Sequence, residues 1–202
     1  MEKSTKSRIL DEALVMFAEN GYKGTNLRDL AARLELSKSA LYKHYSSKED
    51  IWNALLDRME EYYNERFGSV EHMPKQPQSG AELLATSLQM LRFTVYDESI
   101  ILTRKLLLTE QFHDERVSRM ATQYFLESNH NMYTLIFTKM MEDGLMEKED
   151  PRMLACMYTA HISSLIQWCT REPDLKEEVM KQAEEFLSYF ILKYVKNRTQ
   201  EI

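Results

Sequence analysis

The sequence predicts an all-α protein, and three observations carry that prediction. Apolar residues recur at intervals of three and four positions along almost the whole chain, which is the spacing of one helical face. The 202 residues include only five glycines and four prolines, too few for the many turns of an all-β fold. The breaks between periodic stretches fall at residue types that begin or end helices. We therefore expect about nine helices, arranged as a small N-terminal domain and a larger helical domain behind it.

Four helices are expected before residue 68. Ile9, Ala13 and Phe17 share one face of the first, which ends at Gly21, a residue type that readily adopts the left-handed conformation. Each helix follows a hydroxyl side chain that can accept a backbone N–H as an N-cap. The expected caps are Thr5 for the first helix, Thr25 for residues 26–34, Ser37 for a third helix to residue 45, and Ser46 or Ser47 for a fourth to residue 67.

Residues 68–80, GSVEHMPKQPQSG, form the clearest loop, because they contain two glycines, two prolines and little to bury. Asp150-Pro151 marks a later helix start, since proline is favoured in the first helical turn. We place the domain boundary after residue 47, with domains at 1–47 and 48–202. The helices expected beyond the loop are 81–96, 98–110, 114–142, 151–171 and 174–196.

The charge is unevenly distributed along the chain. Its net value is −6, which argues against a nucleic-acid binder if it is read for the whole molecule. Residues 1–48, however, hold nine Lys or Arg against six Asp or Glu, a local charge of +3. The other 154 residues therefore carry −9. Any attraction to DNA should be confined to the N-terminal end.

Several features predict a cytoplasmic protein with no membrane segment. The longest apolar run, residues 100–108, is interrupted by Arg104 and Lys105 and is too short to span a bilayer. The charged N-terminal residues are not typical of a signal peptide. Cys156 and Cys169 lie on one expected helix, roughly 20 Å apart at the helical rise, which is too far for a disulfide.

Residues 25–48, TNLRDLAARLELSKSALYKHYSSK, have the pattern of a helix-turn-helix. Two short helices with hydroxyl caps flank a turn of two or three residues, and the small Ala31 permits a close crossing. Leu30, Leu36 and Leu41 can fill the space beneath. The second helix of the pair offers compact donors and an aromatic ring, which suit a major groove and its phosphate walls. The simpler alternative is a solvated, charged helix face. The candidate DNA-binding residues are Thr25, Arg28, Ser37, Lys38, Ser39, Tyr42, Lys43, His44 and Lys48.

Residues 9–52 resemble the N-terminal domain of the tetracycline-repressor (TetR/AcrR) family. The shared motifs are F-A-x-x-G-Y-x-G-T, L-A-x-x-L, S-K-x-x-L-Y-x-H-Y and S-K-E-D. The resemblance implies a homodimer that binds double-stranded operator DNA and is released when a small molecule binds the C-terminal domain. It also implies roles for single residues: Thr25 and Arg28 near phosphate or a base edge, Ser37, Lys38, Ser39, Tyr42 and His44 facing the groove, and Lys48 on phosphate.

One position departs from the family pattern. The family commonly has glycine in the turn between the two helices, and Glu35 stands there in this chain. If the turn requires a left-handed conformation, a non-glycine residue is strained by about 1–2 kcal/mol. A carboxylate near DNA is also unfavourable. We therefore expect a slightly altered turn or weaker non-specific DNA affinity.

The last two helices are the expected dimer surface, because specific operators are usually bound by two-fold dimers. Both carry broad apolar stripes. The alternative is that these stripes only complete the core of one chain. The candidate interface residues are Met157, Leu165, Val179, Ala183, Phe186, Leu187, Phe190 and Tyr194.

The middle helices are expected to enclose a largely apolar effector. Thirteen Met, eleven Tyr and eight Phe would suit an adaptable pocket with a few polar anchors, although such residues at helical spacing are more often plain core. Arg104 interrupts an apolar run and either pairs with an internal carboxylate, reaches solvent or meets an anionic ligand. The candidate pocket residues are Phe93, Tyr96, Arg104, Gln111, Tyr124, Asn129, Tyr133, His161 and Trp168.

Neither an enzyme nor a metal site is expected, and no cofactor is implied. The sequence contains no P-loop, no G-x-G-x-x-G and no nucleophile elbow. Glu110, His113 and Asp114 offer neighbouring ligand types, but Glu110 and Asp114 flank an expected helix break. No C-x-x-C or H-x-x-x-H occurs. The remaining alternatives are an all-helical adaptor without DNA binding, or a regulator that activates rather than represses.

Overall fold

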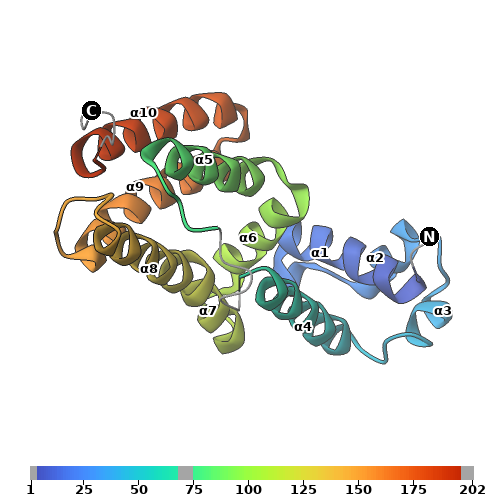
Figure 1. Ribbon diagram of the computed structural model, residues 1–202. Coiled ribbons are helices and arrows are strands. Elements are labelled where there is room, and N and C mark those ends of the chain that lie inside the picture. Colours follow the sequence, from blue (N-terminus) through green and yellow to red (C-terminus); the bar gives the residue numbers. More distant parts are fainter. Residues whose placement is uncertain (1–3, 68–74, 197–202) are drawn as a thin grey trace. The chain divides into compact units, whose positions relative to one another are not determined.

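The computed structural model describes residues 4–67 and 75–196, which group into two compact units. The first unit holds residues 4–67 and 102–121 of those described, and the second holds 75–101 and 122–196. If the continuous run 115–142 is counted once, the described residues form nine helices and no strand, as the sequence predicts (Figure 1). Most of the expected loop at 68–80 lies outside the described residues.

The first unit is built around its N-terminal helices. Helix α1 packs against α2 and α4, and α2 packs against α3. Phe17, Leu30, Leu41 and Leu55 are completely buried in its core, so each helix contributes at least one anchor. The elements of this unit are α1 (Thr5–Gly24), α2 (Leu27–Arg33), α3 (Lys38–Tyr42), α4 (Lys48–Phe67), most of α6 (Glu98–Glu110) and most of α7 (Glu115–Thr122).

Side-chain caps define where these helices begin. Ser4 caps α1 by accepting the N–H of Ser7, and Ser37 caps α3 by accepting the N–H of Ala40. Asn26 caps α2. The prediction for Ser37 is confirmed, whereas the predictions that Thr5 and Thr25 are caps are wrong by one position each. Several neighbouring residues could accept the same N–H groups, so the residue type alone does not fix the register.

The second unit consists mainly of four long helices. They are α5 (Gly80–Tyr96), α8 (Ser128–Glu142), α9 (Pro151–Arg171) and α10 (Lys176–Tyr194). Helix α8 packs against α9, and α10 packs against both α5 and α9 (Figure 1). Gly80 permits a close approach of α5 to α10, because a Cβ atom there would lie 2.6 Å from Cγ2 of Ile191. Asp150 caps α9 and Pro151 begins it, as predicted.

Aromatic side chains fill much of the core of the second unit. The rings of Tyr133, Phe137, Tyr158 and Phe190 contact one another at centroid separations of 4.6–5.7 Å. Such packing contributes about 0.5–1.5 kcal/mol per pair beyond the area that it buries. At least some of the aromatic residues that recur at helical spacing therefore belong to the core.

The run between α7 and α8 differs from the single helix that the sequence predicts. Residues 123–127 form a π-helix, η2 (Gln123–Glu127), which holds one extra residue within the turn. A short 3₁₀ helix, η3 (Pro173–Leu175), leads into α10. No helix in the described part of the chain is long and apolar enough to cross a membrane.

Candidate DNA-binding surface

Helices α2 and α3 and the turn between them form the helix-turn-helix. Asn26 begins α2 by accepting the backbone N–H groups of Arg28 and Asp29 at 3.0 Å each. The turn closes where the N–H of Leu36 donates to the carbonyl oxygen of Ala31 at 2.9 Å. Leu30 and Leu41 are completely buried beneath the pair. This placement agrees with the sequence prediction for Leu30 and Leu41, whereas Leu36 is only half-buried.

Glu35 takes the left-handed conformation in this turn. Its φ is 56°, and it is the only non-glycine residue with a positive φ in the ranges described. The conformation that the family pattern reserves for glycine is therefore retained here in spite of the carboxylate side chain. The associated strain is about 1–2 kcal/mol. The side chain of Glu35 is exposed and can be changed without disturbing the core.

Helix α3 turns its polar residues outward. Leu41 faces the core, while Lys38, Ser39 and Lys43 are exposed and His44 is half-buried. Tyr42 exposes 41% of its surface, and the Nζ of Lys38 lies 5.7 Å from its ring centroid. Lysine, serine and tyrosine thus share one accessible face on a very short helix. Such a face can reach both base edges and phosphate oxygens.

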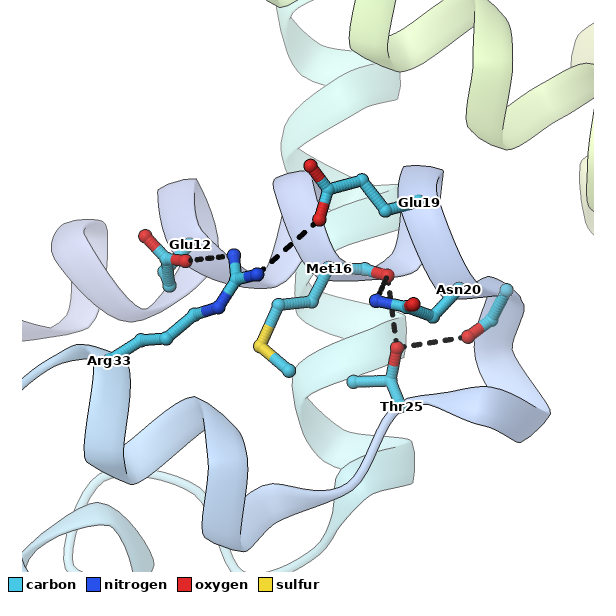
Figure 2. Close-up of polar contacts among 7 residues, drawn as sticks. Glu12, Met16, Glu19, Asn20, Thr25 and Arg33 are labelled. Atoms are coloured by element: carbon cyan, nitrogen blue, oxygen red, sulfur yellow. Dashed lines mark hydrogen bonds and ion pairs between the residues drawn. The ribbon is translucent and has the colours of Figure 1, made fainter.

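Thr25 is not on that face. Only 2% of its surface is exposed, and its hydroxyl lies 3.1 Å from the carbonyl oxygen of Met16 and 2.9 Å from that of Gly21, both of which can accept its proton. Figure 2 shows Thr25 turned toward the end of α1, where Asn20 donates to the same Met16 oxygen at 3.2 Å. The Thr25 hydroxyl therefore joins α1 to α2 and is not presented to a phosphate. Arg28, by contrast, is exposed on α2.

Arg33 holds α2 against α1 on the other side. Its guanidinium lies 2.8 Å from Oε1 of Glu12 and 3.4 Å from Oε2 of Glu19 (Figure 2). The hydrogen bond that Arg33 donates to Glu12, together with the negative charge of that carboxylate, raises the pKa of Arg33. Because both pairs are exposed to solvent, each contributes little to stability by itself. Together with Thr25, these contacts fix the orientation of α2.

The residues expected to bind phosphate at the start of α4 form hydrogen bonds within the protein instead. The Nζ of Lys48 donates to the carbonyl oxygens of Tyr22 at 2.6 Å and Thr25 at 2.8 Å. Asp50 accepts hydrogen bonds from both the N–H and the hydroxyl of Ser46, and the Ser46 hydroxyl lowers the pKa of Asp50. A carboxylate therefore already occupies this helix N-terminus. Lys48 acts in this structure as an internal cation.

The candidate effector residues are divided between the two units. Arg104 and Gln111 belong to the first unit, and the others lie in the second. Tyr133 is buried and shares a hydrogen-bond network with two residues that the sequence did not single out: Ser87, 3.1 Å from its hydroxyl, and Tyr158, 2.8 Å from Ser87. Of the remaining candidates, Phe93, Tyr124 and Asn129 are half-buried, whereas Tyr96, His161 and Trp168 are exposed.

Most of the candidate dimer residues are core residues of one chain. Phe186 and Tyr194 are half-buried against that core, and Met157 is 46% exposed. Other large apolar side chains on α9 and α10 are exposed instead: Met153, Trp168, Tyr189 and Leu192. The residues buried within the chain are Leu165, Val179, Ala183, Leu187 and Phe190.

A capped helix, a tight turn and a second helix with an exposed polar face define a protein of the helix-turn-helix class. Residues 9–55 match the family described as bacterial regulatory proteins, tetR family. This match is confined to the N-terminal segment and agrees with the sequence motifs found there.

One curated relative is a negative transcriptional regulator of the biofilm operon icaADBC, IcaR, from Staphylococcus epidermidis. It is 36% identical over 58 residues, which are 29% of this chain and 31% of the relative. The same regulator from Staphylococcus aureus is 37% identical over 59 residues. The match therefore spans less than a third of either relative and lies in one part of the chain.

Solved structures resemble almost the whole chain in fold. The complex of the repressor SmeT with triclosan has a TM-score of 0.70 at 20% identity and covers 97% of this chain and 94% of its own. SmeT represses a multidrug efflux pump of Stenotrophomonas maltophilia. A transcriptional regulator from Saccharomonospora viridis in complex with choline has a TM-score of 0.66 at 18% identity, over 95% of this chain and 98% of its own. At these identities the likeness shows the fold alone.

Proposed function

We propose that this protein is a ligand-responsive, sequence-specific DNA-binding regulator that acts as a repressor. The observation that carries the proposal is the accessible face of α3, where Lys38, Ser39, Tyr42 and Lys43 stand outside a helix that Leu41 anchors. Donors of this kind on a short, rigidly seated helix suit the major groove. Residues 1–47 are the DNA-binding domain in this proposal, and residues 48–202 are the sensing and dimerisation domain.

Repression and the binding of a small molecule are supported by the relatives. IcaR is a negative regulator, and SmeT is a repressor with a structure in complex with triclosan. We propose that a small, largely apolar effector binds the C-terminal helices and moves α4, which follows the helix-turn-helix directly in the chain. A coupling free energy of about 1–3 kcal/mol between effector and DNA would be typical. A protein that binds chromosomal operators works in the cytoplasm.

A homodimer would place two α3 helices on one operator. Half-sites one helical turn apart require recognition helices about 34–36 Å apart. The surface that we propose for pairing is the exposed part of α9 and α10, with Met153 and Met157 on the first helix and Tyr189 and Leu192 on the second. Exposed apolar side chains gathered on two neighbouring helices are typical of a protein–protein interface.

The test is selection of bound fragments from genomic DNA with the purified full-length chain, followed by binding measurements on the recovered sequence. Tyr42→Ala and Lys38→Ala should each weaken binding at least tenfold, since both side chains lie on the accessible face of α3. The matched control is Arg119→Ala, which removes an exposed cation from α7 of the same unit. Unchanged binding by both α3 variants would contradict the proposed docking surface.

A further inference from the structure

Glu110 is a charged residue buried at the end of α6, far along the chain from the helix-turn-helix. Only 7% of its surface is exposed, and Thr25, Ser87 and Arg104 are the other buried polar or charged residues in the described part of the chain. A carboxylate is costly to bury unless hydrogen bonds compensate for lost water. Its Oε1 accepts the backbone N–H of Tyr22 at 2.9 Å. Tyr22 lies at the end of α1, just before the helix-turn-helix begins.

The backbone beside Tyr22 is shaped to admit this carboxylate. Gly21 has a φ of +70°, and a Cβ atom at that position would lie 2.8 Å from Oε1 of Glu110. Any other residue at position 21 would be strained and would also displace the carboxylate. The helical conformation of α1 is interrupted at Gly21. The interruption and the buried carboxylate therefore occupy one site.

Lys48 holds the same connector from its carbonyl side. Its Nζ donates to the oxygens of Tyr22 and Thr25 and lies 4.3 Å from the centroid of the Tyr22 ring. Burial lowers the pKa of Lys48, and the negative charge of Glu110 acts in the opposite direction. Residues 22–25 are thus fixed by an anion at an N–H group and by a cation at two carbonyl groups. Charge-assisted hydrogen bonds of this kind are stronger than neutral ones.

Two further contacts join the segment after Glu110 to α4. Asp114 accepts the indole N–H of Trp52 at 3.0 Å. Arg116 lies 2.7 Å from Oδ1 of Asp57 and 2.6 Å from Oε2 of Glu60. All these residues belong to the first unit. The turn between α6 and α7 is therefore attached to the helix-turn-helix connector and to α4 at three places.

We infer that Glu110 is a positioning residue for DNA binding: its carboxylate fixes the connector at residues 22–25 and, through it, the direction in which α2 and α3 present their exposed face. The inference rests on the proposed DNA-binding function. Asn26, the cap of α2, follows the connector immediately. A shift in the connector is therefore passed to α2 with no flexible segment between them. Lys48, in this account, positions the connector together with Glu110 and is not a phosphate contact.

The test compares Glu110→Ala, Glu110→Gln and the matched control Glu115→Ala, an exposed glutamate in the first turn of α7. Affinity for the selected operator duplex is measured at a temperature where circular dichroism shows each full-length variant to be folded. We expect Glu110→Ala to lose at least tenfold in affinity. Glu110→Gln should recover much of it, because the amide oxygen still accepts the N–H of Tyr22. Glu115→Ala should bind as the wild type does.

Two further measurements separate positioning from direct contact with DNA. The slope of log affinity against log salt should be unchanged in Glu110→Ala, because the residue touches no phosphate. Hydrogen exchange at the Tyr22 amide should become faster. If Glu110→Ala does not fold, Glu110→Asp, which withdraws the carboxylate by one methylene, takes its place with the same expected loss. Wild-type affinity in Glu110→Ala, or in Glu110→Asp where it takes its place, would overturn the inference alone. A wild-type chain that binds no duplex would overturn the proposed function.

Discussion

Glu35 adopts a backbone conformation that glycine adopts at lower cost. Replacing it with glycine removes about 1–2 kcal/mol of left-handed strain and adds about 0.5–1 kcal/mol of flexibility to the unfolded chain. We therefore predict that Glu35→Gly raises the free energy of unfolding by about 0.5–1 kcal/mol in urea titrations. Glu35→Ala is the control, because it removes the carboxylate but keeps the Cβ atom. Equal stability of the two variants would show that backbone strain is not the cause.

Thr25 and Lys48 illustrate what the sequence determines at this scale and what it does not. The motif specifies a hydroxyl at 25 and a lysine at 48, and both positions were expected to approach phosphate. The structure turns the hydroxyl toward the end of α1 and the ammonium toward two carbonyl oxygens of the connector. These directions depend on the interruption of α1 at Gly21. That interruption was predicted as a helix end, but the contacts that it creates are tertiary and leave no pattern in the sequence.

Helix α2 depends on its cap more than the longer helices do. It has only seven residues, so the loss of one cap removes a large part of its hydrogen bonding. We predict that Asn26→Ala costs about 1 kcal/mol of stability and weakens DNA binding, although the Asn26 side chain serves the helix and need not touch DNA. Asn26→Ser should restore both properties in urea unfolding and operator titrations. Full operator affinity in Asn26→Ala would contradict this account of α2.

Asp114, just before α7, should make the free energy of unfolding of the first unit depend on pH. Burial by itself raises the pKa of Asp114, but hydrogen bonds from the Trp52 indole and from the N–H groups of Val117 and Arg116 outweigh it, and the pKa lies below its ordinary value. A lowered pKa stabilises the folded state at neutral pH, and this stabilisation is lost as pH falls through the folded pKa. Asp114→Asn should therefore lose less unfolding free energy between pH 5 and pH 3 than the wild type.

The control for that measurement is Glu115→Gln, which changes the neighbouring exposed carboxylate. It should follow the wild-type pH profile, because Glu115 is exposed on the same helix. An Asp114→Asn profile as steep as that of the wild type would show that the hydrogen bonds to Asp114 do not stabilise the folded state.

The elements themselves could be predicted well because their ends carry local signals. Ser37 and Asp150-Pro151 begin helices as expected. Gly21 interrupts α1 where the sequence predicts its end, although α1 continues to Gly24. The π-helix at 123–127 could not be predicted from the sequence. One extra residue within a turn changes the backbone hydrogen bonds but leaves the spacing of apolar residues close to that of an α-helix. Helix ends are decided by neighbouring residues, whereas irregular turns within a helix are decided by packing.

At the scale of the molecule, the apolar residues of α9 and α10 fall into two groups, one buried in the core and one exposed. Leu165 and Phe190 are buried within one chain, whereas Met157 and Leu192 are 46% and 78% exposed. The sequence alone could not distinguish the buried residues from the exposed ones, because both groups are apolar and recur at helical spacing. Only the packing of α8 and α5 against the same helices shows which stripe is already covered.

We predict that Met157→Glu combined with Leu192→Glu converts a dimer into a monomer, because two charges would be buried at the proposed interface. Sedimentation velocity measures the change directly. Leu135→Glu is the matched control, since Leu135 is 56% exposed on α8, which is not one of the two proposed interface helices. A double variant that sediments as the wild type does would place the dimer interface elsewhere.

The proposed function depends on DNA binding by the exposed face of α3, and the salt dependence of binding tests this most directly. Binding of the full-length chain to its selected duplex should weaken by about 10³-fold or more between 50 and 200 mM salt, as expected for several phosphate contacts. Lys38→Ala combined with Lys43→Ala should reduce the slope of log affinity against log salt by about 2. Binding that is insensitive to salt, or a double variant with the wild-type slope, would contradict the account.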